Sequence, residues 1–213
     1  MAPDLDTTAP VQPPDVSGDL GQGGVGQRAA RPDGTLKVKG EFAFSSDLWA
    51  ADMLWGTTLR SPHPHARITS VDIGPALATP GVHTVLTYDD VPGRKLYGLE
   101  RPDQPVLCDG TARFHGEPVA IVAADHPETA RRAASRIVVD YDVLEPLTDP
   151  QRAVDPAETL RVHPGANVVR HLRIRRGDPN ATAEVVVTGE YEVGMQDQAF
   201  LGPESGLAVP AED

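Results

Sequence analysis

The clearest pattern of apolar and polar positions lies in residues 118–144. The run "PVAIVAA" at 118–124 is continuously apolar, which is typical of a strand buried on both faces. Apolar residues then recur at helical spacing over 130–137, after a start at Asp125 that resembles a capping box. A second apolar run at 137–144 follows as a strand. The pattern predicts a β-α-β unit inside a mixed α+β domain.

Weaker patterns precede this unit. Strand signals occur at 37–44, 53–61, 66–73 and 82–87, and a helical turn closed by proline and glycine is predicted at 74–81. The intervening "PHPH" contains prolines that forbid regular strand pairing. These elements extend the predicted first domain to residues 31–148.

Proline and glycine mark the limits of this domain. Residues 1–30 are rich in Pro, Gly and Asp without periodicity, so they are predicted to form a disordered tail. Residues 149–164 are punctuated by proline and are predicted to be a linker with at most a short helical turn. The run "EVVVTGEYEV" at 184–193 predicts a strand. It is assigned to a second domain that starts near residue 165 and is cut off at residue 213.

Composition excludes several classes of protein. The formal charge of −12 argues against nucleic-acid binding, because phosphate recognition requires clustered Lys and Arg. No apolar stretch reaches the roughly 18 residues that a membrane-spanning helix needs. Cys108 is the only cysteine, so the chain forms no internal disulfide and holds no iron–sulfur cluster of its own. We therefore expect a cytoplasmic protein with neither nucleic acid nor membrane as a partner.

A few side chains are candidates for chemistry on residue type alone. His63 and His65 have a spacing that some metal sites use, but the proline between them favours a tight turn. Cys108 with a histidine could be a nucleophile, although a lone cysteine is more often buried and inert. Neither candidate has a supporting residue that the sequence can identify.

The polar stretch at Gln196 raises a different question. Gln196 and its polar neighbours follow a strand signal and are flanked by Met195, Phe200 and Leu201, which predicts that the amide is buried. A buried amide is costly unless it is paired. Its acceptor is either an oxygen of a cofactor or an internal hydrogen-bond network that closes a domain joint. The residues alone leave both alternatives open.

A set of motifs in order resembles one known family. "RPDGTLKVKGEFAFSSDL", "LRSPHPHARITSVD", "PGVHTVLTYDDVPG", "QPVLCDGTARFHGEPVAIVAADHPETARRAA", "YDVLEPLTDPQRAV" and "VTGEYEVGMQDQAFLGPESGLAVP" follow one another over residues 24–213. This order is similar to that in the large, molybdenum-binding subunit of the xanthine oxidase and xanthine dehydrogenase family, and most similar to its bacterial members. The resemblance implies an a/b hammerhead domain at 31–148 and the truncated start of a molybdopterin-binding domain at 165–213.

The resemblance also implies an activity. Family members hydroxylate an electron-poor ring carbon of xanthine or hypoxanthine with oxygen from water. Molybdenum is carried on molybdopterin, in the cytosine dinucleotide form, while partner subunits carry 2Fe-2S clusters and FAD and pass electrons to NAD+. Two alternatives remain open: the same family acting on aldehydes or another N-heterocycle, and a non-catalytic docking module for the iron–sulfur and FAD subunits.

Two site residues are carried over from the family pattern. Gln196 matches the glutamine that hydrogen-bonds the apical oxo ligand of molybdenum, and Gly194 matches the glycine that lets the backbone approach the cofactor. Met195 stands where many relatives have a second glycine. The general-base glutamate of the family is expected downstream of residue 213, so no catalytic residue is assigned in this chain. The chain by itself is expected to be inactive.

Overall fold

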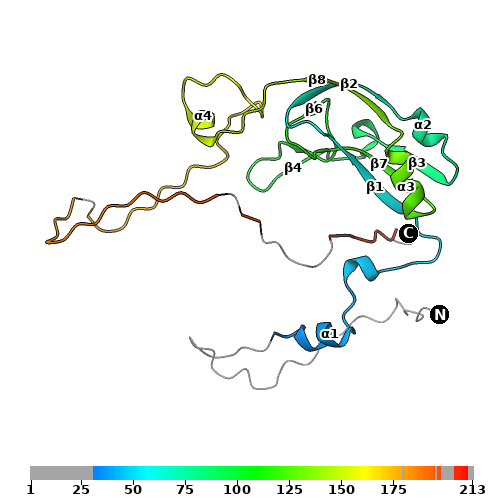
Figure 1. Cartoon of the computed structure of the whole chain (residues 1–213), viewed down its shortest axis with the longest axis horizontal. Coiled ribbons are helices and arrows are strands. Elements are labelled where there is room, and N and C mark those ends of the chain that lie inside the picture. The colour runs from blue at the N-terminus through cyan, green and yellow to red at the C-terminus, as the bar shows by residue number, and fades with distance from the viewer. Residues whose placement is uncertain (1–30, 179, 195, 198–203, 211–213) are drawn as a thin grey trace. The chain divides into compact units, whose positions relative to one another are not determined.

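The protein is described by a computed structural model over residues 31–178, 180–194, 196–197 and 204–210 (Figure 1). Its contacts divide the chain into two compact units, and each is described by itself. The larger unit comprises residues 51–190, and the smaller comprises residues 1–50 together with 191–213. The regular sheets lie in the larger unit.

A three-stranded antiparallel sheet places the most apolar run at its centre. β7 (Pro118–Ala124) pairs on one side with β1 (Trp55–Arg60) and on the other with β3 (Val82–Leu86). In this register Thr58 lies opposite Ile121. Because both edges of β7 are paired, its backbone N–H and C=O groups find partners on both sides within the sheet.

A second antiparallel sheet has β2 (Ala66–Asp72) at its centre. β6 (Thr111–Ala112) and β8 (Val138–Val143) pair with its two sides. A separate short hairpin is formed by β4 (Leu96–Tyr97) and β5 (Gln104–Pro105). The observed strands confirm those predicted at 53–61, 66–73, 82–87, 118–124 and 137–144.

Helix α3 (Pro127–Ala134) packs against β1 and β7. Its buried face consists of Thr129, Ala130, Ala133 and Ala134, and the short alanine side chains let the helix approach the sheet closely. The predicted cap at Asp125 is wrong by one residue. His126 is the N-cap, and its Nδ1 accepts a hydrogen bond from the Glu128 N–H at 3.1 Å. The extended backbone of His126 lets an imidazole nitrogen take the role that a carboxylate was expected to play.

The remaining helices of the larger unit are short. They are α2 (Gly74–Leu77), the 3-10 turn η2 (Tyr88–Asp90) and α4 (Pro150–Val154). α2 confirms the helical turn predicted at 74–81. α4 confirms the short helical turn predicted in the linker at 149–164. No helix among the described residues is long and apolar enough to cross a bilayer.

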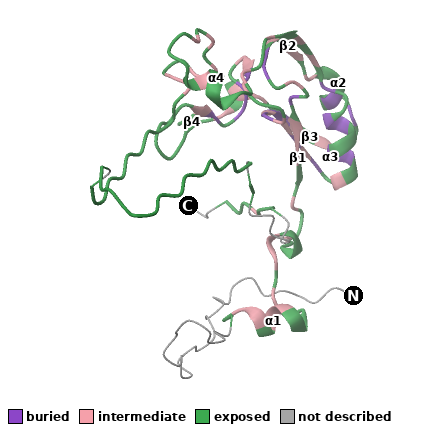
Figure 2. Ribbon diagram, turned by 60° about the vertical axis from the view of Figure 1, so that its left-hand side comes forward, coloured by how far each residue is buried: buried purple, intermediate pink, exposed green. Residues whose placement is uncertain are grey.

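The core lies on both sides of β7. Ala120 and Val122 are fully buried in one cluster with residues of α2 and α3. Val119 is 2% exposed and packs in a second cluster with Cys108 and Ala112. Figure 2 shows the buried residues gathered on α3 and the neighbouring strands. The prediction of a strand buried on both faces is confirmed.

The predicted β-α-β unit is not a single-sheet unit. β7 belongs to the first sheet and β8 to the second, so α3 connects two sheets instead of crossing over one. All strand pairs of the described residues are antiparallel. Sequence periodicity identifies each strand but carries no information on which neighbour it pairs with.

The smaller unit differs from its prediction. Residues 37–44 were predicted as a strand, but α1 (Gly34–Lys39) occupies the start of this segment. The Lys37 ammonium lies 2.6 Å from the Asp33 carboxylate one turn earlier, and Gly40 ends the helix in the left-handed conformation at φ +70°. This local pairing and capping outweigh a short alternation of apolar residues. A 3-10 turn, η1 (Ser45–Asp47), follows.

The strand predicted at 184–193 is also absent. This segment is extended and exposed, and no other described residue pairs with it. Val185 and Val187 are 77% and 88% exposed. A strand is defined by hydrogen bonds to a neighbour, so β-favouring residues alone do not produce one.

We expect Val122→Ala to lower the free energy of unfolding by about 2 kcal/mol, because it removes two buried methyl groups and leaves a cavity beside α3. Val143→Ala is the matched control, since Val143 is 59% exposed on an edge strand. Its effect is expected to stay within about 0.5 kcal/mol. Urea unfolding measures both changes, and equal losses would contradict the position of Val122 in the core.

Candidate functional site

The two residues predicted to meet the cofactor lie in the smaller unit. Gln196 is exposed in extended chain, and Gly194 is likewise exposed. Met195, Phe200 and Leu201, which were expected to enclose the amide, lie outside the described residues. The described residues therefore do not bury the Gln196 amide, and its predicted contact with a cofactor stays a prediction.

The local geometry leaves both residues open. The Gln196 side chain is exposed, and an exposed amide is satisfied by water, so its exposure is compatible with either acceptor. A Cβ placed on Gly194 would meet no atom within 4 Å among the described residues. The roles of both residues stay predictions.

A buried polar cluster forms the loop that leads into β7. The Arg113 guanidinium donates two hydrogen bonds to the Asp109 carboxylate, at 2.8 Å and 3.0 Å. Glu117 is 1% exposed, and its Oε2 accepts a hydrogen bond from the Arg113 backbone N–H. Its Oε1 has no hydrogen-bond partner among the described residues and lies 3.9 Å from Arg113 Nη1. A single arginine thus links two carboxylates.

Burial dominates the electrostatics of this cluster. It raises the pKa of the Glu117 carboxyl, against the opposing effect of the Arg113 N–H and guanidinium. The same desolvation, with the charge of Glu117 nearby, raises the pKa of the Cys108 thiol to about 12. Cys108 is therefore a protonated, buried thiol, which supports the inert interpretation over the nucleophile.

The two histidines of the "PHPH" turn have structural contacts. The His63 ring packs edge-on against Tyr141, with 4.9 Å between ring centroids. His65 is buried, and its Nδ1 lies 2.7 Å from the Glu145 carbonyl oxygen, to which it donates. Within the part of the chain that the structure describes, no three His, Cys, Asp or Glu side chains gather as a metal site. These contacts favour the interpretation of a tight turn over metal ligands.

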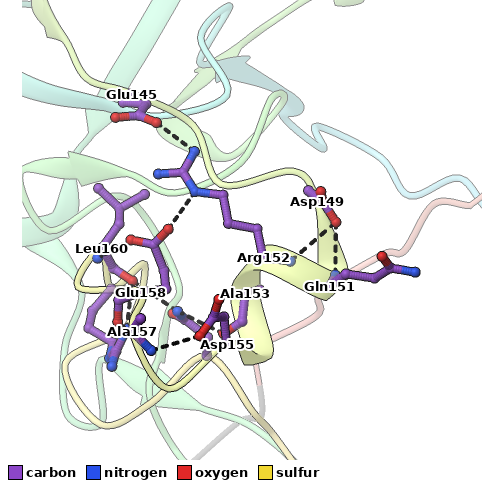
Figure 3. A network of polar contacts seen from close by, with 11 residues as sticks. Glu145, Asp149, Gln151, Arg152, Ala153, Asp155, Ala157, Glu158 and Leu160 are labelled. Carbon is purple, nitrogen blue, oxygen red and sulfur yellow. Dashed lines mark hydrogen bonds and ion pairs between the residues drawn. The ribbon is translucent and has the colours of Figure 1, made fainter.

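The segment after β8 is organised by one arginine. Figure 3 shows the Arg152 guanidinium between two carboxylates, those of Glu145 and Glu158. Its Nη1 lies 2.6 Å from Glu145 Oε1. Asp149 is the N-cap residue of α4, and its Oδ1 accepts a hydrogen bond from the Gln151 N–H at 2.8 Å. Within the predicted linker, Arg152 thus ties Glu158 and α4 to Glu145, just after β8.

This segment and the β4–β5 hairpin line an open pocket with a volume of about 920 Å³. Its apolar lining includes Leu147, Ala153 and Val162. At its side the His163 Nδ1 lies 3.7 Å from the Asp103 carboxylate, without a hydrogen bond. The described contacts do not identify a ligand for this pocket.

Comparison with known proteins gives a consistent result. Residues 39–145 match the family described as "Aldehyde oxidase and xanthine dehydrogenase, a/b hammerhead domain". The chain is 38% identical to a probable xanthine dehydrogenase subunit of Bacillus subtilis, over 86% of its own length and 25% of that protein's. It is 31% identical to the nicotinate dehydrogenase large molybdopterin subunit of Eubacterium barkeri, over 86% of the chain and 44% of that protein.

Solved structures agree with the sequence matches. The aldehyde oxidoreductase from Desulfovibrio gigas superimposes with a TM-score of 0.57 at 32% identity, over 63% of this chain and 16% of that one. The CO dehydrogenase from Oligotropha carboxidovorans gives a TM-score of 0.54 at 34% identity, over 62% of this chain and 17% of that one. The chain therefore spans less than half the length of the curated relatives named above.

The buried carboxyl of Glu117 predicts a pH dependence of stability. Its pKa is raised above the ordinary 4.5 in the folded state, so its contribution is fully present below about pH 4.5 and is lost as pH rises through the folded pKa. Glu117→Gln removes the titration while keeping an acceptor for the Arg113 N–H. The wild type is expected to lose more unfolding free energy than this variant as the pH rises above about 4.5 and through the raised folded pKa.

Urea unfolding at several pH values measures this difference. Glu190→Gln, at an exposed carboxylate, controls for the loss of one negative charge. If the free energy of unfolding changes with pH to the same extent in the wild type and in Glu117→Gln, burial of Glu117 does not govern its titration.

Proposed function

Because the chain belongs to the aldehyde oxidase and xanthine dehydrogenase family, we propose that it is part of the molybdenum-binding subunit of a xanthine dehydrogenase. The observation that carries this proposal is the 38% identity, over 86% of the chain, to the probable xanthine dehydrogenase subunit of Bacillus subtilis. The proposed reaction is hydroxylation of a ring carbon of xanthine or hypoxanthine with oxygen from water. Its electrons leave through partner subunits.

In this proposal Gln196 holds the cofactor by one hydrogen bond. Its carboxamide donates an N–H to an oxygen ligand of the molybdenum centre, and Gly194 leaves space for the pterin to approach the backbone. This role is supported by the match of Gln196 and Gly194 to the family's motif. When bound, the molybdenum cofactor supplies the oxygen-transfer and two-electron chemistry.

The hammerhead domain contributes a framework in this proposal. Arg113 joins the buried Glu117 to Asp109 and so holds the loop before β7. We propose that the catalytic base and the substrate pocket belong to parts of the subunit outside this chain. Subunits with 2Fe-2S clusters and FAD are the proposed partners, with the cytosine dinucleotide form of molybdopterin as the cofactor and NAD+ as the acceptor.

A second candidate substrate class is favoured by a relative. The chain is 32% identical to a protein named aldehyde oxidoreductase from Megalodesulfovibrio gigas, over 88% of its own length and 22% of that protein. An aldehyde presents the same kind of electron-poor carbon as a purine ring. The proposed site residues, Gln196 and Gly194, face the cofactor and do not distinguish the two substrates.

In the intact complex, Gln196→Ala is expected to lower kcat/KM for xanthine by about 10- to 100-fold, the usual cost of removing a group that orients a metal centre. Molybdenum content, measured by plasma mass spectrometry on the same preparation, separates loss of the cofactor from loss of turnover. Gln151→Ala is the matched control, because Gln151 is exposed at the start of α4. Wild-type turnover with full molybdenum occupancy in Gln196→Ala would remove Gln196 from the site.

The substrate class is tested by comparing xanthine, hypoxanthine and a series of aldehydes in the intact complex. We expect kcat/KM for a purine to exceed that for the best aldehyde by about 100-fold or more, the scale of discrimination given by hydrogen bonds to substrate polar groups. A higher kcat/KM for an aldehyde would assign the second candidate instead.

A further inference from the structure

One buried oxygen of the larger unit has no hydrogen-bond partner among the described residues. It is Oε1 of Glu117, whose side chain is 2% exposed, whereas Oε2 of the same carboxyl accepts a hydrogen bond from the Arg113 backbone N–H. An ionised carboxylate here leaves one acceptor unpaired where water does not reach it. The cost is lower when the carboxyl is protonated, and it is also lower when a donor moves onto Oε1.

A cationic donor lies just beyond the reach of this oxygen. Arg113 Nη1 is 3.9 Å from Glu117 Oε1, whereas a hydrogen bond of this type needs about 2.7–3.2 Å. Nη1 donates instead to Asp109 Oδ1 at 2.8 Å and to the Thr111 carbonyl oxygen at 3.2 Å. An Nη group has two N–H donors, so Nη1 reaches Glu117 only by giving up one of these bonds. The two carboxylates therefore compete for one guanidinium.

Exposure to solvent decides this competition. The side chain of Asp109 is 27% exposed, so water can hydrate its carboxylate if the guanidinium leaves, whereas Glu117 has no such replacement. An unpaired charge costs far more in a buried position than near the surface. When both carboxylates are charged, Arg113 is therefore more stable on Glu117. The observed pairing with Asp109 fits a Glu117 that carries a proton.

The charge of Glu117 can change while that of its neighbours does not. Burial raises the pKa of the Glu117 carboxyl above its ordinary 4.5, and Arg113 and Asp109 are the charged groups that also affect it. Burial likewise raises the pKa of the Cys108 thiol to about 12 and raises the pKa of the Tyr141 hydroxyl, so both stay neutral up to about pH 9. The ionisable side chains on the surrounding elements are Arg60 at the end of β1, His63 after it, Cys108, Asp109 and Arg113 of the loop, His115 before β7, and Tyr141 of β8.

The competition affects a second pocket of the larger unit. Asp109 lies on the wall of an open pocket with a volume of about 530 Å³, which residues of β2 and η2 also line. The backbone of this wall is fixed, since the Ile68 N–H donates to the Gly110 carbonyl oxygen at 2.9 Å. A transfer of the guanidinium therefore changes the charge on the pocket wall without moving the strands.

We propose that Arg113 is a proton-controlled switch between two carboxylates. While Glu117 carries its proton, the guanidinium holds Asp109. When Glu117 loses this proton to water, Nη1 moves onto Glu117 Oε1, and Asp109 is freed as an unpaired negative charge on the pocket wall. The switch depends on the contacts of this loop and is independent of the proposed function.

Asp109→Asn measures how strongly the guanidinium holds Asp109. In urea unfolding of the full chain at about pH 5, we expect this substitution to lower the folded-to-unfolded ratio by about tenfold, because a hydrogen-bonded ion pair is lost. At about pH 9, where Arg113 has moved to Glu117, the expected loss is at most about twofold. In a Glu117→Gln background the loss is expected to be about tenfold at both pH values. Asp89→Asn, at an exposed carboxylate of the same pocket, is the matched control, with about a twofold effect or less throughout.

Crystal structures of the protein at about pH 5 and about pH 9 test the movement itself. We expect the distance from Arg113 Nη1 to Glu117 Oε1 to stay near 3.9 Å at the lower pH and to shorten to about 3 Å at the higher one. An equal loss for Asp109→Asn at both pH values, or a pH-dependent loss that persists in Glu117→Gln, would overturn the proposal. A guanidinium that stays on Asp109 in both structures would do the same, because repulsion between the two carboxylates would then explain a pH-dependent loss.

Discussion

Strand β7 has to be covered on both faces, and the larger unit is arranged to meet this requirement. Its continuous apolar run gives it no face that tolerates water, so it is stable only as a central strand. β1 and β3 pair with its edges, α3 covers one face, and Val119 packs on the other with Cys108. Each of these elements is positioned by its contact with β7.

The same requirement explains the buried carboxylate. Glu117 directly precedes Pro118, the first residue of β7, and is fixed there by the Arg113 N–H. Its backbone also pairs with Ser61, whose N–H donates to the Glu117 carbonyl oxygen at 2.9 Å. The polar cluster therefore stabilises the entry to the central strand. Its contacts give it this structural role.

Beyond α4 the chain is organised differently. From residue 155 onward the described residues contain neither helix nor strand, and most of their large apolar side chains are exposed. Burial of apolar area is the main source of folding free energy, so this segment cannot gain stability as β7 does.

The sequence predicted the parts of the fold that local patterns determine. The runs at β7 and α3 were identified correctly, and the resemblance predicted the family and its hammerhead domain. Pairing partners, the His126 cap and the short β4–β5 hairpin were missed, because they depend on contacts between distant residues or on single hydrogen bonds. The helix at Gly34–Lys39 was mistaken for a strand, since a short alternation fits either. The role of Gln196 stays a prediction, because its neighbours Met195 and Phe200 lie outside the described residues.

The central claim is that β7 organises residues 51–154 into a stable framework, whereas residues 170–189 lack a core of their own among the described residues. Amide hydrogen exchange of the chain tests this claim most directly. The claim predicts that β7 amides exchange ~1,000-fold more slowly than those of residues 170–189. Equal protection of both groups would contradict it.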